Sequence, residues 1–490
     1  MSPMRDWDGD ALGVLLAPFT GTEVPAWLTA PLDAGLAGVI LFRANTPDPA
    51  TARALATALH EAAPQLLVTL DEEGGDVSRL LSAGAAGLPT AWTFGVVDDV
   101  ELTRRAGEAL GAVLAACDLD MDLAPVLDVS TDARNPVIGT RAYGADPDRV
   151  RRHAHAMADG LRSRGIGRCG KHFPGHGATS VDSHTALPRI DLPLGAVESE
   201  HLAPWDITPW LDAVMTAHVL VPALGEGPAS IAPWSRPLLD GICGPGGFHG
   251  LVITDALDMA AVADDPGYAE AAVRAVEAGA DLVCLGTSLR RDDQAMLCEA
   301  HDALVDAIES GRIARETLAA RARRTRERIG EIRARRRSTA PVSLDDALAA
   351  LAQIGAVAAA RAVTVRGGAL RRSGVTVVDA RSRRDHASNS RGSALVDLLR
   401  AAGVDAWPGE ADALPEGRDV IVVTRLPRAD EAEGAIVRAV LAERSDAICL
   451  HVGVPDAAWR HDRTVFAHGA SRANLAAAVA ALLPEPAGLR

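Results

Sequence analysis

The sequence predicts an α/β protein, with a (β/α)8 barrel of the TIM type followed by a smaller α/β domain built as a three-layer sandwich. At 490 residues the chain is too long for one ordinary hydrophobic core. Short apolar runs alternate with amphipathic helical stretches over roughly the first 300 residues, and seven or eight such runs favour a barrel over an open sheet. A second series of apolar runs and helices then follows a change of composition near residue 340.

The apolar runs are the expected barrel strands. Because they are apolar throughout rather than alternating, we expect a parallel sheet that is buried on both faces. Helices are expected over about 48–63 and 147–164. The expected strands cover residues 37–42, 66–71, 122–127, 167–171, 213–218, 251–255 and 282–285.

An arginine-rich stretch separates the two series. Residues 312–337 hold eleven arginines, which we interpret as a solvated terminal helix with pairs such as Arg323 and Glu327. We therefore expect a catalytic barrel over 1–335, a linker over 336–345 and a second domain over 346–490.

The second domain has neither a GxGxxG motif nor a phosphate-binding loop, so nucleotide binding lacks support. Its expected elements are strands at 375–379, 419–424, 447–452 and 464–467, with helices near 391–402, 428–444 and 471–483.

Composition excludes several classes of function. The net charge of −16 argues against a general nucleic-acid binder, because phosphates would be repelled. The six cysteines are scattered without a CxxC pair, as is usual for reduced, buried thiols. With no basic N-terminal region before an apolar core and no long apolar run, we expect a cytoplasmic protein without a membrane anchor. The oligomeric state stays open.

One stretch is unusually dense in titratable side chains. Residues 171–177 read KHFPGHG, and Asp182-Ser183-His184 follows shortly after. The glycines and the proline predict a loop. A carboxylate two residues before an imidazole can orient the ring, which suits His184 as an acid/base near neutral pH. Lys171 is the single lysine of the chain, and its compact ammonium suits one close polar contact.

Such a loop is also compatible with phosphate or metal binding. A zinc site built from His172, His176, Asp182 and His184 has suitable ligand types. Its spacing across proline and two glycines is not that of a preformed tetrahedral site, and no HExxH motif is present.

Ionisable residues follow the ends of several expected strands. Asp71, Lys171, His218 and Asp255 each lie at or just past such an end, and in a barrel these ends meet at the rim where active sites form. Asp255 could act as a nucleophile toward a sugar carbon, although a helix cap is the alternative.

Two further rim segments end in arginine. Asp71 begins the segment that ends at Arg79, and Arg141 ends the turn that begins at Asn135. An acid and two arginines at one rim suit a polyhydroxylated or acylated sugar.

These segments form ordered motifs: DEEGGDVSR, LAPVLDVS, NPVIGTRAYG, KHFPGHGATSVDSH and VITDALDM. Over about residues 10–330 the chain resembles glycoside hydrolase family 3, specifically its bacterial β-N-acetylglucosaminidase branch. The resemblance implies that Asp255 is the nucleophile of a retaining double displacement and that His184, oriented by Asp182, is the acid/base. It implies no cofactor and no metal, and it implies sugar-binding roles for Asp71, Arg79, Arg141, Lys171 and His172.

The resemblance further implies a cytoplasmic exo-β-N-acetylglucosaminidase that acts on muropeptide-like fragments in cell-wall recycling. Because a neutral imidazole repels an anionic acceptor less than a carboxylate does, a phosphorylase that forms a sugar 1-phosphate is an alternative. An inactive sugar-binding protein is another. The chain departs from the family pattern at Glu72, where glutamine is frequent, and at Ala256, where a second aspartate is common. The second domain is expected to be structural or to shape the cleft.

Overall fold

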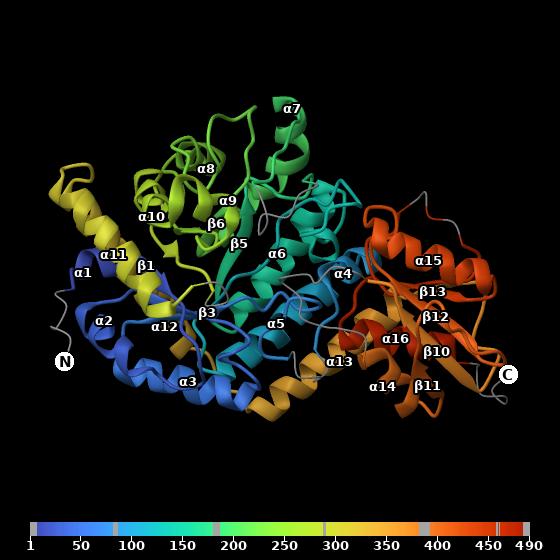
Figure 1. Ribbon diagram of the computed structural model, residues 1–490. Coiled ribbons are helices and arrows are strands. Elements are labelled where there is room, and N and C mark those ends of the chain that lie inside the picture. Colours follow the sequence, from blue (N-terminus) through green and yellow to red (C-terminus); the bar gives the residue numbers. More distant parts are fainter. Residues whose placement is uncertain are drawn as a thin grey trace.

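The computed structural model describes residues 7–81, 87–179, 187–287, 291–381, 393–456, 459 and 461–483. Two sheets lie side by side, each with its own helices (Figure 1). The first is an eight-stranded parallel sheet and the second has six strands. The predicted fold class, a TIM-type barrel with a smaller α/β sandwich, is therefore confirmed.

The first sheet curves into a barrel. Its order is β7-β6-β5-β4-β3-β2-β1-β8, so the last strand pairs with the first. A bridge between Ile253 and Leu282 joins β7 to β8 and brings the two ends together. The strands are β1 (Leu15–Ala17), β2 (Gly38–Leu41), β3 (Leu67–Leu70), β4 (Met121–Asp122), β5 (Gly167–Phe173), β6 (Ala213–Thr216), β7 (Leu251–Thr254) and β8 (Val283–Cys284).

The expected strands overlap β2 to β8, and three details differ. The strand expected at 122–127 shares only Asp122 with β4. Strand β1 was not predicted, although an apolar run covers Val14 to Ala17. Strand β5 continues through Lys171 and His172 to Phe173, so the first part of the KHFPGHG stretch is strand and the expectation of a loop there was wrong. Both polar side chains find partners inside the protein, and the strand therefore stays buried.

Helices form the outer layer of the barrel. The two long predicted helices are present, and each begins at an aspartate cap followed by proline: Asp48 accepts from Thr51 N–H and Asp146 from Asp148 N–H. The helices are α1 (Gly9–Leu12), α2 (Thr29–Ala34), α3 (Pro49–Ala62), α4 (Ala91–Val97), α5 (Val100–Ala116), α6 (Pro147–Ser163), α7 (Leu194–Ala196), α8 (Ser235–Cys243), α9 (Ala260–Val262), α10 (Tyr268–Glu277), α11 (Asp293–Glu309) and α12 (Arg315–Arg337).

Helix α12 is not the solvated helix that its arginines suggested. Ile329 and Ile332 are buried and pack with the side chains inside the barrel. Its arginines pair with acids that stand just before barrel strands, including Arg335 with Asp212 at 2.7 Å. The arginine run therefore closes the amino-terminal end of the barrel, which corrects the prediction.

The second domain is a three-layer sandwich. Helices α14 (Ser393–Ala401) and α16 (Arg472–Leu482) cover one face of its sheet, and α15 (Glu431–Glu443) covers the other. The sheet order is β11-β10-β12-β13-β14-β9, parallel except for β9 at one edge. Its strands are β9 (Thr364–Arg366), β10 (Gly374–Asp379), β11 (Asp405–Pro408), β12 (Asp419–Thr424), β13 (Ile448–His451) and β14 (Thr464–Phe466).

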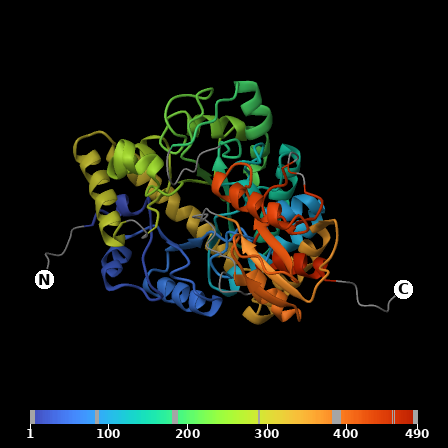
Figure 2. The same cartoon turned by 45° about the vertical axis from the view of Figure 1, so that its right-hand side comes forward.

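Helix α13 (Leu344–Ala362) joins the two domains. It packs on α4 and α5 of the barrel and on α16 of the second domain, and Figure 2 brings this second domain forward. An ion pair of 2.7 Å between Arg361 and Asp99 fastens it to the start of α5. Among the described residues, we find no helix with the combined length and apolarity that crossing a bilayer requires.

Candidate active site

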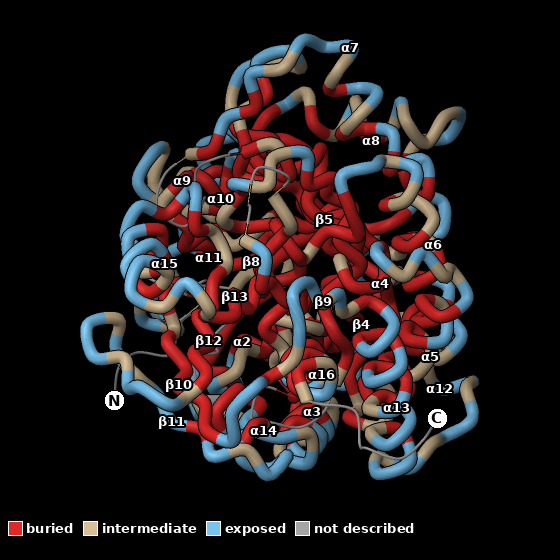
Figure 3. Tube along the Cα trace, turned by 90° about the vertical axis from the view of Figure 1, so that its right-hand side faces the viewer, coloured by how far each residue is buried: buried red, intermediate tan, exposed pale blue. Residues whose placement is uncertain are grey.

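The carboxyl ends of the barrel strands carry the polar residues that the sequence singled out. Asp71 follows β3, Lys171 and His172 lie near the carboxyl end of β5, and Asp255 follows β7. Figure 3 shows β5 within the buried interior of the molecule. Since parallel strands of a barrel end at one rim, these side chains approach one another from different strands.

Lys171 is the centre of this network and is 1% exposed. Its Nζ lies 2.7 Å from Asp71 Oδ1 and 2.6 Å from Glu73 Oε1. Burial alone would lower the Lys171 pKa, but the two carboxylates outweigh it and raise the pKa above its ordinary value. Burial would likewise raise the pKa of both acids, yet Lys171 and nearby guanidinium groups hold the pKa of Asp71 and Glu73 below the usual range.

Arg141 approaches the same acids from the short helix η2 (Gly139–Arg141). Its Nε and Nη2 donate to the two oxygens of Glu73 at 2.8 and 2.7 Å, a bidentate contact. Its Nη2 also lies 3.4 Å from His172 Nε2. Glu73 thus links Arg141 to Lys171, although 98 residues of sequence separate it from the lysine.

A β-bulge orients His172. The pairing of β5 with β6 shifts between Lys171 and Phe173, and such a shift re-aims side chains that would otherwise alternate between faces. His172 Nδ1 lies 2.6 Å from Asp128 Oδ2. Because the carboxylate only accepts and Arg141 only donates, Nδ1 carries the proton and Nε2 acts as the acceptor.

Asp128 Oδ1 also accepts a hydrogen bond of 2.7 Å from the backbone N–H of His176. Burial would raise the Asp128 pKa, but the two imidazoles lower it below its ordinary value. Burial lowers the pKa of His176 to about 4, so this ring is neutral at physiological pH. Asp128 is completely buried and holds the turn after β5 in place.

Arg79 completes the charged cluster. Its Nη2 lies 3.3 Å from Asp71 Oδ2, and its backbone N–H donates to Glu72 at 2.9 Å. Glu72 also accepts from Leu80 N–H, so this buried acid anchors the loop. Burial raises the pKa of Glu72 and, further still, that of its neighbour Asp122.

Asp255 is half-buried at the end of β7. Its backbone N–H donates to Thr216 O at 2.9 Å, and its Oδ1 accepts from Ala256 N–H at 2.8 Å. Burial raises the pKa of the Cys169 thiol inside the barrel, and Asp71 and Asp255 each add to that increase. Asp71 follows β3 and Asp255 follows β7, so both carboxylates stand at the same rim of the barrel.

His218 holds the turn after Asp255. Its Nε2 lies 2.8 Å from Ala256 O and its Nδ1 lies 2.6 Å from Ser230 Oγ. The ring is completely buried. Since a carbonyl only accepts, Nε2 carries the proton and the serine hydroxyl donates to Nδ1.

Asp182 and His184 lie outside the described residues. Of the hypothetical zinc ligands, His172 is bound to Asp128 and His176 Nδ1 lies 2.8 Å from Thr179 Oγ1. Within the part of the chain that the structure describes, no group of three such side chains could hold a metal ion.

Sequence reasoning missed two members of the network, Glu73 and Asp128. Both stand in motifs named above. Glu73 lies two residues after Asp71, and Asp128 lies near the end of LAPVLDVS. An acid inside an apolar run was the available signal for Asp128, and its contact with His172 was not visible in the sequence.

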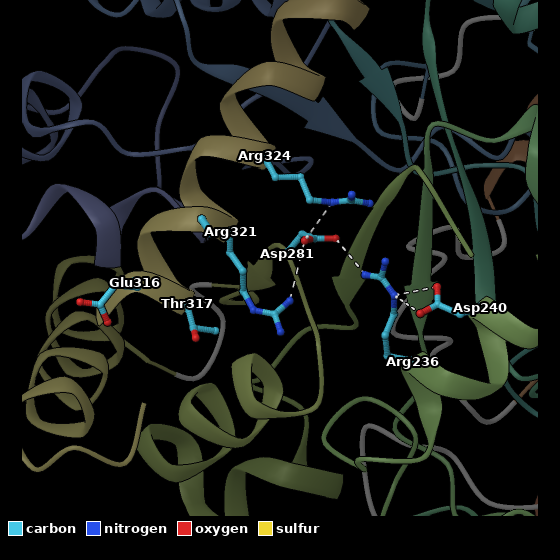
Figure 4. A pocket seen from close by; sticks show the side chains of 8 residues that line it. Arg236, Asp240, Asp281, Glu316, Thr317, Arg321 and Arg324 are labelled. Carbon is cyan, nitrogen blue, oxygen red and sulfur yellow. Dashed lines mark hydrogen bonds and ion pairs between the residues drawn. The ribbon is translucent and has the colours of Figure 1, made fainter. Parts of the chain in front are cut away.

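A hollow of about 570 Å³, lined mainly by charged side chains, lies at the opposite end of the barrel. Figure 4 shows Arg236, Arg321 and Arg324 around Asp281, which is 1% exposed. Asp281 precedes β8 and accepts from Val252 N–H at 2.9 Å. This cluster fastens α12 and α8 to the strand starts, and ligands of barrel enzymes bind at the other rim.

Comparison with known proteins identifies the family. The profile described as the glycosyl hydrolase family 3 N terminal domain matches residues 21–327. The chain belongs to glycosyl hydrolase family 3. A beta-hexosaminidase of Chromobacterium violaceum is 39% identical to it over 279 residues, which cover 55% of this chain and 76% of that protein. Another from Nitrosomonas eutropha is 34% identical over 287 residues.

Solved family 3 structures agree with the fold. A family 3 beta-N-acetylglucosaminidase from Paenibacillus sp. superimposes with a TM-score of 0.82 and 28% identity, over 98% of this chain and 96% of that one. NagZ from Neisseria gonorrhoeae superimposes with a TM-score of 0.55 and 29% identity, over 70% of this chain and 97% of that one. The protein is thus a glycoside hydrolase whose second domain has a counterpart in the Paenibacillus enzyme.

Proposed function

We propose that this family 3 member is a retaining exo-β-N-acetylglucosaminidase that releases N-acetylglucosamine from the non-reducing end of muropeptide-like substrates. The observation that carries the proposal is the half-buried carboxylate of Asp255 at the same rim as the buried Lys171 network. The names of the sequence relatives and of the Paenibacillus structure support the acetamido sugar. The proposed setting is cytoplasmic.

In this mechanism Asp255 attacks the anomeric carbon and forms a covalent glycosyl-enzyme. His184, oriented by Asp182, protonates the leaving oxygen and then takes a proton from the attacking water. The half-buried position of Asp255 supports its role, because a carboxylate must be reachable to act as a nucleophile. The Ala256 N–H on Oδ1 orients the carboxylate for that attack.

The sugar is held by the charged cluster opposite Asp255. Polyhydroxylated ligands are bound well by neighbouring carboxylates and cations, which accept from and donate to vicinal hydroxyls. Because these groups already hold one another in place, little ordering is required when a sugar binds. The proposed sugar-binding residues are Asp71, Arg79, Arg141, Lys171 and His172.

We assign catalysis to residues 1–335, the linker to 336–345 and the second domain to 346–490. Three boundaries support this division. The family match ends at residue 327, α12 ends at Arg337 and α13 begins at Leu344.

Turnover of an aryl N-acetyl-β-glucosaminide beside the matching β-glucoside, with and without phosphate, tests the proposed function. We expect free N-acetylglucosamine at the same rate whether or not phosphate is present, and slow turnover of the glucoside. Formation of a sugar 1-phosphate would make the protein a phosphorylase. Turnover of neither substrate would leave it as a sugar-binding protein.

A further inference from the structure

The second domain touches the loop that carries the proposed sugar-binding residues. This loop runs from Asp71 at the end of β3 through Arg79. In its middle, Asp76 Oδ1 accepts the backbone N–H of Ala470 at 2.8 Å. Ala470 lies between β14 and α16, 394 residues further along the chain, and a direct contact therefore joins the second domain to this loop.

Asp76 has a second partner inside the barrel. Its Oδ2 lies 3.4 Å from the hydroxyl of Thr140, which directly precedes Arg141 in η2. Arg141 in turn binds Glu73 through both carboxylate oxygens. One carboxylate therefore connects the second domain with the two segments that hold the cluster around Lys171.

A second set of hydrogen bonds joins the two domains at Thr90, which lies against Gly75 of the loop. The hydroxyl of Thr90 donates to the carbonyl of His468, and its N–H donates to Asn474 Oδ1 at 3.3 Å. Asn474 Nδ2 donates to Thr93 Oγ1 at 2.8 Å. Thr90, His468 and Asn474 are 2%, 4% and 1% exposed, so these bonds are shielded from water.

The backbone at this junction leaves no room for a side chain at Gly75 or Gly469. A Cβ on Gly75 would lie within 2.7 Å of the Thr90 main chain and side chain, and one on Gly469 would collide with the Thr90 side chain. The loop at Gly75 and the second domain at Gly469 therefore both lie too close to Thr90 for either glycine to be replaced by a residue with a side chain. A displacement of residues 468–470 would therefore also displace the loop.

We propose that residues 468–470 of the second domain set the position of the sugar-binding loop 71–79, with Asp76 as the positioning residue, and thereby set the affinity for the sugar. The inference rests on the proposed function for the identity of the ligand. It gives the second domain a role at the active site without placing one of its own side chains on the substrate.

Kinetics on the full-length protein test this role. Asp76→Ala, which loses the contacts with Ala470 and Thr140, and Ala470→Pro, which replaces the N–H donor with a proline ring, are each expected to raise KM for the aryl N-acetyl-β-glucosaminide about three- to tenfold. We expect kcat to change little, because the loop binds substrate and transition state alike. Asp76→Asn should recover the wild-type KM, since the amide still accepts from Ala470 N–H and can donate to Thr140.

The matched control is Asp99→Ala, which breaks the contact with Arg361 at another point of the same domain junction. Its KM should equal that of the wild type. In the double variant Asp76→Ala/Ala470→Pro, KM should be no higher than in the weaker-binding single variant, because both changes break one link. An unchanged KM in Asp76→Ala, or an equal rise in Asp99→Ala, would overturn the proposal.

Hydrogen exchange separates this inference from the proposed activity. In Ala470→Pro, amides of residues 71–81 should exchange faster than in the wild type, while Asp99→Ala should leave them unchanged. This readout needs no substrate. Exchange that stays at the wild-type rate in Ala470→Pro would refute the role of the second domain even if turnover is never observed.

Discussion

At the scale of single residues, the site depends on charges that are buried together. Lys171 lies between Asp71 and Glu73, and these acids bind Arg79 and Arg141. Each charge is stable only because its partners are present, since an unpaired buried charge costs several kcal/mol. A buried network of this kind is rigid, which suits the recognition of a sugar by fixed donors and acceptors.

Lys171→Met tests this dependence. The variant leaves two buried carboxylates without their shared cation, so we expect the free energy of unfolding to fall by about 3–5 kcal/mol at pH 7, together with a loss of activity. The folded-state pKa of Asp71 and Glu73 lies below the unfolded value, so their stabilisation is complete above about pH 4.5 and is lost as the pH falls.

In the variant these acids lose the cation that lowers their pKa. They can be protonated at a higher pH, and the stability difference from wild type should shrink as the pH is lowered from 7 to 5. Urea unfolding at both pH values measures this. If the difference in unfolding free energy between wild type and Lys171→Met does not change with pH, the destabilisation comes from lost packing and not from the lost charge.

At the scale of elements, the strand ends position the site and the arginines of α12 close the other end of the barrel. Asp281 is almost completely buried and lies 3.4 Å from Arg324 and 3.5 Å from Arg236. Stability and catalysis are thus assigned to opposite ends of one barrel, as is usual for this architecture.

Asp281→Ala should therefore destabilise the protein without altering substrate affinity. Three guanidinium groups lose a buried partner, and we expect the free energy of unfolding to fall by about 3–5 kcal/mol. Glu316→Ala, at the exposed edge of the same hollow, is the control and should change it by less than about 0.5 kcal/mol. A raised KM in Asp281→Ala would contradict the separation of the two ends.

Contacts between distant segments set the limit of what the sequence predicted. The barrel, the sandwich and the strand-end positions of Asp71, Lys171 and Asp255 follow from local apolar runs, which sequence displays directly. The contacts of Glu73 with Lys171 and of Asp76 with Ala470 join residues far apart in the chain. The prediction of a solvated helix at α12 was wrong for the same reason, because the acidic partners of its arginines lie in other segments.

At the scale of the whole molecule, two buried imidazoles lie in the second domain near its junction with the barrel. His451 and His468 are 1% and 4% exposed, and burial lowers the pKa of each to about 4. The unfolded chain binds protons at these rings near pH 6.5. Their contribution to stability is therefore complete above pH 6.5 and is lost as the pH falls toward 4.

His468→Asn should reduce this pH dependence. Asparagine tolerates the left-handed backbone at this position, where φ is 60°, and it keeps the carbonyl that binds Thr90. The loss of unfolding free energy between pH 7 and 4.5 should be smaller than in the wild type by up to about 3 kcal/mol. His249→Asn, a change at an exposed ring, is the control and should leave the wild-type pH dependence unaltered.

The central claim is that Asp255 is the nucleophile of a β-N-acetylglucosaminidase, and turnover of an aryl N-acetyl-β-glucosaminide by wild type and Asp255→Ala tests it most directly. Because Asp255 lies at the rim and the strand before it is complete without its carboxylate, the variant should unfold at the wild-type temperature. We predict that its turnover falls by about 10⁴-fold. Turnover at the wild-type rate in the folded variant would contradict the account.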